Sequence, residues 1–300
     1  MDIDSLLKCL VSPGCIIGQI INGVIIAMIL FLVASGLSLI LGVLGVLNFS
    51  HGSLYMVGAY ITYTVIEKFT NFGMALLIAP IAVGILGLIL ERFFIRRIYG
   101  YDELYQLLMT YAFILIFDDA VKFIWGILDL SVPMPRAFQR PPVQIFGAIF
   151  PIYYIFIVIM GVMIACGIWV FLSKTKLGKI ISTVASDPEM LMCVGINVPL
   201  VYTLVFGLGS LLAGLGASLA APLRSISPGM GFAVIIESFV IVIIGGLGNI
   251  LGTFAVAILF GLLRSFGILG FPMYELSFIY VLMAIVLIIR PAGLFGKLRS

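Results

Sequence analysis

Charged side chains are scarce in this sequence. Of its 300 residues, 16 are Lys or Arg and 13 are Asp or Glu, which makes 10%, while 63% of the residues are hydrophobic. An average soluble chain is about 25% charged. Because a water-exposed surface cannot be built from so few charges, the composition excludes a soluble globular enzyme, a nucleic-acid-binding protein with a basic face and a disordered chain.

Residues that bind metals are also few. The cysteines are Cys9, Cys15, Cys166 and Cys193. Their spacing matches neither a metal site nor a redox pair, so we expect all four to be small apolar packing residues. His51 is the only histidine, and no acidic cluster stands beside it in the sequence. We therefore predict no metal and no cofactor.

Sequence signatures of catalysis are missing as well. No Gly-x-x-x-x-Gly-Lys-Ser/Thr phosphate loop occurs, which excludes ATP hydrolysis by that route. An intramembrane enzyme is one alternative. No Ser–His pair or His-Glu-x-x-His motif supports it, and the adjacent Asp118 and Asp119 would point about 100° apart on a helix. We therefore expect a non-catalytic protein.

Long hydrophobic runs fill most of the chain. Residues 9–66 contain no Asp, Glu, Lys or Arg, and about 20 apolar residues suffice for one helix to cross a bilayer. This run must therefore cross more than once. The predicted membrane-spanning segments are 16–41, 52–66, 74–91, 104–126, 150–173, 199–222, 232–248, 250–269 and 275–290.

These segments predict helices rather than barrel strands. They are too long and too continuously apolar for the alternating pattern of a barrel, and a helix satisfies its own backbone hydrogen bonds in lipid. We expect an all-α polytopic integral membrane protein with about nine membrane-crossing helices, eight to ten being compatible with the sequence. The whole chain, residues 1–300, is predicted to form a single transmembrane domain.

Basic residues predict the orientation of the chain. They cluster in short connections and at the C-terminus: Arg92, Arg96 and Arg97; Lys174, Lys176 and Lys179; Arg290, Lys297 and Arg299. Placing these clusters in the cytoplasm puts the C-terminus there too, and it puts the N-terminus and the Pro133–Pro142 loop outside. Arg136 and Arg140 in that loop run against the rule.

Two glycine-rich stretches interrupt the hydrophobic segments. The first break, Gly42–Gly52, contains Asn48, Ser50 and His51, and the second break, Gly245–Gly252, contains Gly248 and Asn249. Glycine and asparagine readily interrupt a helix. Paired interruptions in the two halves of a transporter are a pointer to its substrate path, so these residues are candidates for lining it. The alternative is two tight turns without ligand contact, and the depth of either break in the bilayer stays open.

The segment 177–197 differs from the membrane spans. It follows a basic run and contains a short amphipathic piece from Ala185 onwards. Asp187, Pro188 and Glu189 suit the start of a helix, while Gly195 and Asn197 suit its end. We expect a short helix on the cytoplasmic face that couples the protein to a partner. The alternative is an ordinary connecting loop.

Charged residues inside the predicted spans have possible partners. Lys122 follows Asp118 by four residues, which allows an ion pair on one helical face. Glu237 and Arg264 lie on either side of a turn near residue 250. In an antiparallel helix pair they would reach nearly the same depth near the outer face, where they could pair. The alternative is that each reaches water separately.

Five blocks of sequence carry a family resemblance. The run from Ser35 to Tyr60, which includes Asn48-Phe-Ser-His51-Gly, closely resembles the signature of permease subunits from branched-chain amino acid ABC transporters of the Liv type. Four further blocks agree in order: Gly195-Ile-Asn-Val with Ala213-Gly-Leu-Gly-Ala217; Pro228-Gly-Met-Gly231; Ile244-Gly-Gly-Leu-Gly-Asn-Ile-Leu-Gly252; and Arg290-Pro-Ala-Gly-Leu-Phe-Gly296. The opening block and short tail look more like the H-type subunit than the M-type subunit.

The resemblance implies a function and partners. Such permeases form a heterodimer with a second, related permease subunit (M-type, LivM-like), two cytoplasmic ABC ATPases drive them, and an extracytoplasmic solute-binding protein feeds them. It implies a location in the bacterial or archaeal inner membrane and makes Ala185–Asn197 the segment that contacts an ATPase. Relatives carry aliphatic amino acids, amides, urea or organic acids. The family usually has a basic residue near Glu237 and an acidic one near Arg264, so the two signs are exchanged here.

We therefore predict the non-catalytic, pathway-forming subunit of an ABC importer for a small polar organic solute. The alternative from another class is a secondary transporter or channel that moves solute without partners. Few buried acidic residues are available for ion coupling, which argues against that alternative.

Overall fold

The computed structural model describes residues 9, 11–139, 141–145, 148–270 and 275–296. Lys297, Arg299 and Arg140, which entered the orientation argument, lie outside them. Within the described residues, nine helices of 15 residues or more follow one another: α2 (Pro13–Leu44), α3 (Ser50–Phe69), α4 (Phe72–Phe93), α5 (Glu103–Trp125), α6 (Ile152–Lys174), α9 (Val198–Ala220), α10 (Met230–Gly245), α11 (Ile250–Gly270) and α12 (Glu275–Ile289).

Each long helix coincides with one of the segments predicted from the sequence. In the part of the chain that the structure describes, five helical stretches are long and apolar enough to cross a membrane by themselves: α2, α4 with the short 3-10 helix η1 (Ile95–Ile98), α6, α9 and α11. The helix α10 is shorter but also apolar. The all-α, polytopic prediction is confirmed.

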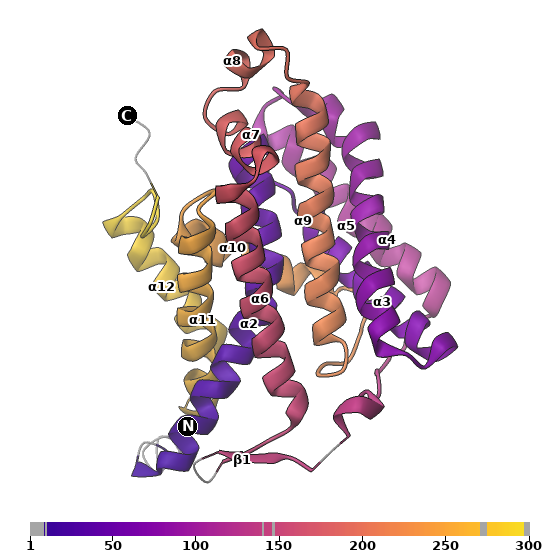
Figure 1. The fold of residues 1–300 in the computed structure, drawn as a ribbon, viewed down its shortest axis with the longest axis vertical. Coiled ribbons are helices and arrows are strands. Elements are labelled where there is room, and N and C mark those ends of the chain that lie inside the picture. The colour runs from indigo at the N-terminus through magenta and orange to yellow at the C-terminus, as the bar shows by residue number, and fades with distance from the viewer. Residues whose placement is uncertain (1–8, 10, 140, 146–147, 271–274, 297–300) are drawn as a thin grey trace.

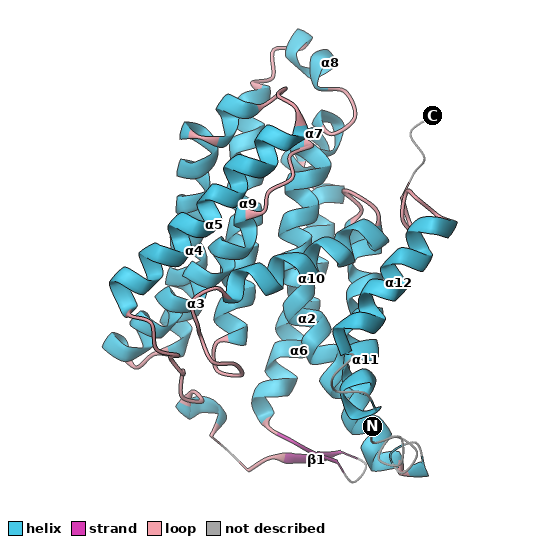
Figure 2. Ribbon diagram, turned by 180° about the vertical axis from the view of Figure 1, so that it is seen from behind, coloured by secondary structure: helices cyan, strands magenta, loops and turns pink. Residues whose placement is uncertain are grey.

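The long helices run up and down along the long axis of the molecule (Figure 1). One end carries the short helices α7 (Lys176–Val184) and α8 (Pro188–Cys193), and we call it the α8 end. The other carries the start of α2 and the antiparallel hairpin of β1 (Val143–Ile145) and β2 (Ala148–Phe150), and we call it the hairpin end. The 3-10 helix η2 (Arg136–Phe138) precedes this hairpin. Figure 2 shows the same arrangement from behind, with α10 crossing the bundle obliquely.

The helices α2 and α9 form the centre of the bundle. Nearly all of α2 from Ile25 to Leu41 is buried, and α9 packs against it. Small residues permit this contact, since a Cβ added at Gly36 would lie 2.4 Å from the carbonyl oxygen of Gly209. Such close backbone approach is how membrane helices associate without a hydrophobic driving force between them.

The interpretation of the cysteines as packing residues is wrong. Cys9 and Cys15 form a disulfide, with their Cα atoms 5.2 Å apart. A turn before Pro13, closed by a hydrogen bond from Ser12 N to Cys9 O of 3.0 Å, brings the two together. Cys166 and Cys193 are free thiols on exposed positions. Sequence spacing alone could not reveal a disulfide that depends on this turn.

Candidate functional site

The first break lies inside the bundle rather than at its end. The helix α2 ends at Leu44, with Gly45 in a left-handed conformation (φ 66°), and α3 starts only at Ser50. His51 Nε2 donates a hydrogen bond of 3.1 Å to the carbonyl of Val33. Val33 precedes the end of α2 by eleven residues, about 16 Å along a helix. The chain therefore turns back beside α2, and α3 begins part-way along it.

Polar side chains of the first break are sealed from the surface. Asn48, Ser50 and His51 have no exposed surface. Ser50 Oγ donates to Asn48 Oδ1 at 2.5 Å. Asn48 Nδ2 and His51 Nδ1 find no hydrogen-bond partner among the described residues. Because buried polar groups are normally satisfied, these two atoms mark a place where a polar species could be accommodated.

The second break is a turn at the α8 end. Gly246 and Gly248 have φ angles of 92° and 77°, which favour glycine. Asn249 Oδ1 accepts from Gly252 N at 3.0 Å, and Asn249 Nδ2 donates to the carbonyl of Phe295 at 2.9 Å. The break between two helices predicted here is confirmed, with α10 ending at Gly245 and α11 beginning at Ile250.

The two breaks touch the same two helices. A Cβ added at Gly42, near the end of α2, would lie 2.4 Å from the Cα of Gly248. The ring of Phe49 packs on that of Phe239 in α10, with the ring centres 4.7 Å apart. The first break is thus buried and the second partly exposed, and α2 and α10 connect them.

The segment from Ala185 to Gly195 forms the tip of the α8 end (Figure 1). The carboxylate of Asp187 accepts from Met190 N at 2.9 Å and caps α8, in which Pro188 is the first residue. Gly195, with φ 85°, closes it. The predicted short helix is confirmed, and a second one, α7, precedes it.

Asn197 has a different role from the one expected. It was predicted to end the short helix, but its Oδ1 accepts from Leu200 N at 3.1 Å and caps the start of α9. Pro199 in the first turn of α9 explains this, because proline suits that position and asparagine is a favoured cap before it.

Exposed apolar side chains cover α8. Met190 is 48% exposed, Met192 is 52% exposed and Val194 is 73% exposed, while Leu191 points inward and packs with Val198. The acidic Asp187 and Glu189 are exposed beside them. The helix thus presents an apolar surface with an acidic edge.

The ion pair expected between Glu237 and Arg264 is present. Arg264 Nη1 donates to Glu237 Oε1 at 2.7 Å, and the two side chains are 14% and 8% exposed respectively. The pair joins α10 to α11. Lys122 also pairs with Asp118, at 2.5 Å, as the four-residue spacing predicted.

A buried polar cluster at the α8 end was missed by the sequence reasoning. Glu91, in the last turn of α4, is completely buried and accepts from Arg96 Nε at 3.2 Å and from Tyr99 Oη at 2.8 Å. Arg96 also reaches α9, where it donates to the carbonyl of Pro199 at 3.0 Å and to the hydroxyl of Thr203. An acidic residue at the end of an apolar segment, followed by arginines, was the available signal.

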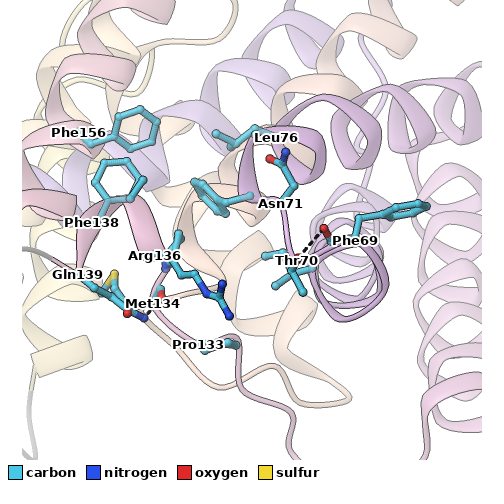
Figure 3. Close-up of a pocket in the computed structure, with 15 residues that line it drawn as sticks. Phe69, Thr70, Asn71, Leu76, Pro133, Met134, Arg136, Phe138, Gln139 and Phe156 are labelled. Atoms are coloured by element: carbon cyan, nitrogen blue, oxygen red, sulfur yellow. Dashed lines mark hydrogen bonds between the residues drawn. The ribbon is translucent and has the colours of Figure 1, made fainter.

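A cavity at the hairpin end was also missed. It has a volume of about 850 Å³ and lies between the α3–α4 turn, the loop around η2 and the start of α6. Figure 3 shows the rings of Phe138 and Phe156 beside each other on one side of it, with Arg136 and Gln139 nearby on the loop. Its signal in the sequence was the proline-rich loop, which was read only for orientation.

Metal ligands do not converge in this structure. Within the residues that it describes, no group of three or more His, Cys, Asp or Glu side chains could hold a metal ion. The geometry instead offers interrupted helices, a buried ion pair and an exposed short helix.

Comparison with known proteins decides the family. Residues 19–289 match the family described as the branched-chain amino acid transport system / permease component. The chain belongs to this family. Its permeases are the non-catalytic subunits of ABC importers, they are multi-pass proteins of the inner membrane, and they work with ATPase and solute-binding partners.

Individual relatives agree over most of the chain. The high-affinity branched-chain amino acid permease BraD of Pseudomonas aeruginosa is 27% identical over 292 residues, covering 93% of this chain and 95% of that protein. LivH of Escherichia coli is 24% identical over 294 residues, covering 93% and 95%. The fructose import permease FrcC of Rhizobium meliloti is 31% identical over 128 residues, covering 39% and 36%. No solved structure matches the chain.

Proposed function

We propose that this permease takes up branched-chain amino acids or a related small polar organic solute, as one half of a heterodimer with a second, related subunit. Two ATPases drive it from the cytoplasm and a binding protein delivers solute outside. Family membership over residues 19–289, and relatives named for branched-chain amino acid transport, support this proposal. The observation that carries the ATPase coupling is the capped, apolar α8 at one end of the bundle.

The α8 end is proposed to face the cytoplasm. Basic residues of three connections gather there: Arg92, Arg96, Arg97, Lys174, Lys176, Lys179 and Arg290. Lys and Arg are enriched in cytoplasmic loops. The Cys9–Cys15 disulfide lies next to the start of α2, at the hairpin end. Disulfides persist in oxidising compartments, which supports an outer location for the N-terminus.

The segment Ala185–Gly195 is proposed to dock on an ATPase. Exposed apolar residues rimmed by polar groups mark protein interaction sites. The helix α8 has such a surface, and Asp187 and Glu189 at its edge suit a partner with basic groups. The docking explains why a short helix is held so firmly by a cap at each end.

The two breaks are proposed to border the solute path. Asn48, Ser50 and His51 provide buried polar groups part-way along α2, and Gly245, Gly248 and Asn249 form the turn that α2 and α10 connect to them. Irregular backbone at membrane depth is tolerated where protein covers it or where it lines a cavity. In the conformation described, protein covers the first break, so the path would open there during transport.

Reconstitution with the partners tests the proposal. Proteoliposomes that contain both permeases and the ATPases, supplied with binding protein, should accumulate solute only with ATP. Reversing the charge of Asp187 and Glu189 to lysine should abolish transport while the permease stays in the membrane. The matched control reverses Asp102 and Glu103, an N-cap and first-turn acid pair at the start of α5.

Three results would contradict parts of this proposal. Solute flux into liposomes that lack the ATPases would favour the secondary transporter or channel. Full coupling in the α8 variant would overturn docking through α8. A thermal-shift screen on the binding protein identifies the solute, since a bound ligand raises stability, and a preference for a sugar over amino acids would contradict the proposed solute class.

A further inference from the structure

The last turn of α4 carries a carboxylate with no exposed surface. Glu91 accepts from both Nε and Nη2 of Arg96, at 3.2 and 3.3 Å, and from the Tyr99 hydroxyl. A buried charge is costly unless it is paired and hydrogen-bonded, and here it is both. Burial and the neighbouring Glu91 carboxylate raise the pKa of Tyr99, which keeps the phenol protonated as a donor. The cluster is therefore a fully formed polar core at the α8 end.

Arg96 extends this core to another helix. Its Nη2 donates to the carbonyl of Pro199 at 3.0 Å and to the hydroxyl of Thr203, both in the first two turns of α9. The rings of Tyr99 and Tyr202 add an edge-to-face contact, with centres 5.5 Å apart. One guanidinium thus ties the end of α4 to the start of α9, with the directional geometry that arginine provides.

The start of α9 follows directly on α8. Only residues 194–197 separate the two helices. Ile196 N donates to the carbonyl of Leu191 at 3.0 Å, and Asn197 caps α9. Leu191 and Val198 share one buried cluster. A displacement of α8 must therefore move the first turn of α9, where Arg96 is bound.

The helices α4 and α9 stay in contact below this point. A Cβ added at Gly87 would lie 2.1 Å from the Ser210 hydroxyl, and one added at Gly214 would lie 3.0 Å from the Cα of Pro80. Such close packing makes the two helices a stiff pair. The polar cluster is the point at which this pair joins the α8 segment.

We infer that Glu91, Arg96 and Thr203 form a pin that transmits movement of α8 to the α4–α9 pair. This inference rests on the proposed docking of α8 to an ATPase. The three residues are positioning residues, since none of them touches the solute or the ATPase in the inference. Weakening the pin should separate ATP hydrolysis from transport without preventing assembly.

The test measures transported solute per ATP hydrolysed in the complete reconstituted transporter. Thr203→Val removes only the hydroxyl, Arg96→Lys keeps the charge but loses the fork, and Glu91→Gln keeps the shape. We expect the ratio to fall roughly tenfold or more in Glu91→Gln and Arg96→Lys, the size of one lost hydrogen bond to a charged group. Thr203→Val should lower it less. Arg97→Lys, at an exposed neighbouring arginine with no printed contact to this cluster, is the matched control and should keep the wild-type ratio.

The double variant Glu91→Gln with Arg96→Lys adds a readout that a merely structural role would not move. If the two residues act as one pin, the double variant should lower the ratio about as much as either single variant. Wild-type ratios in all three single variants would overturn the inference. Loss of assembly in all three would also overturn it, since the cluster would then be structural only. Wild-type protein that never transports would instead overturn the proposed function.

Discussion

At the scale of single residues, the described charges within the helices are placed by partners. Glu91 pairs with Arg96, Asp118 with Lys122, and Glu237 with Arg264. A charge left alone inside a span costs roughly 2.5 to 3.5 kcal/mol on translocon scales. Pairing offsets this cost, and it makes each charge informative about which helices are neighbours.

The exchanged signs of Glu237 and Arg264 give a prediction. Glu237→Lys and Arg264→Glu should each destabilise the permease by about 3 to 5 kcal/mol, because each leaves two like charges together in a mostly buried place. The double exchange reverses the pair and should recover much of the loss. Thermal unfolding of the purified permease and its yield in the membrane measure the effect. Strictly additive losses would show that the pair does not hold α10 to α11.

At the scale of elements, caps and glycines decide where helices begin, end and meet. Asp187 and Asn197 cap α8 and α9 by the same side-chain bond to a backbone amide three residues on. Glycines instead set the distance between helices. A Cβ added at Gly52 in α3 would lie 2.1 Å from the carbonyl oxygen of Gly231 in α10.

Gly52→Ala should therefore push α3 and α10 apart beside the first break. We expect a loss of about 1 to 3 kcal/mol, the usual cost of overpacking, measured as a lower midpoint of thermal unfolding. Gly18→Ala is the control, because a Cβ at Gly18 in α2 meets nothing within 4 Å. That change should be neutral or slightly stabilising, since alanine favours helix. Equal effects of the two substitutions would contradict close packing at Gly52.

At the scale of the whole molecule, the nine long helices separate two ends. Ser131 follows α5 toward the hairpin end, and Ser186 lies between α7 and α8 at the other. Both are exposed serines. In a background with Cys166→Ser and Cys193→Ser, a membrane-impermeant thiol reagent should label Ser131→Cys from outside the cell. It should label Ser186→Cys only after the membrane is opened. Labelling of both from one side would contradict the proposed topology.

The two breaks should differ in access to water. Ser50 is fully buried and Asn249 is partly exposed. In the same background, Asn249→Cys should react with a water-soluble thiol reagent in the resting protein. Ser50→Cys should react only when nucleotide drives the assembled transporter through its cycle. A Ser50→Cys that stays inert in every nucleotide state would mean that the first break is a packed turn and not part of the path.

Local sequence was enough for much of this structure. The scarcity of charge and the length of the apolar runs predicted the spans, because a bilayer accepts only segments that satisfy their own backbone. The Asp187-Pro188-Glu189 start of α8 was legible because a cap acts within one helical turn. The pairing of Glu237 with Arg264 followed from their equal distance from a turn.

Tertiary structure decided what depends on residues far apart in the chain. The depth of the first break is set by His51 reaching Val33, and the sequence leaves that contact open. The pin from Glu91 through Arg96 to Thr203 joins residues more than a hundred positions apart. Hydropathy and capping act over a few residues and can be read along the chain, whereas such contacts exist only once the helices have packed.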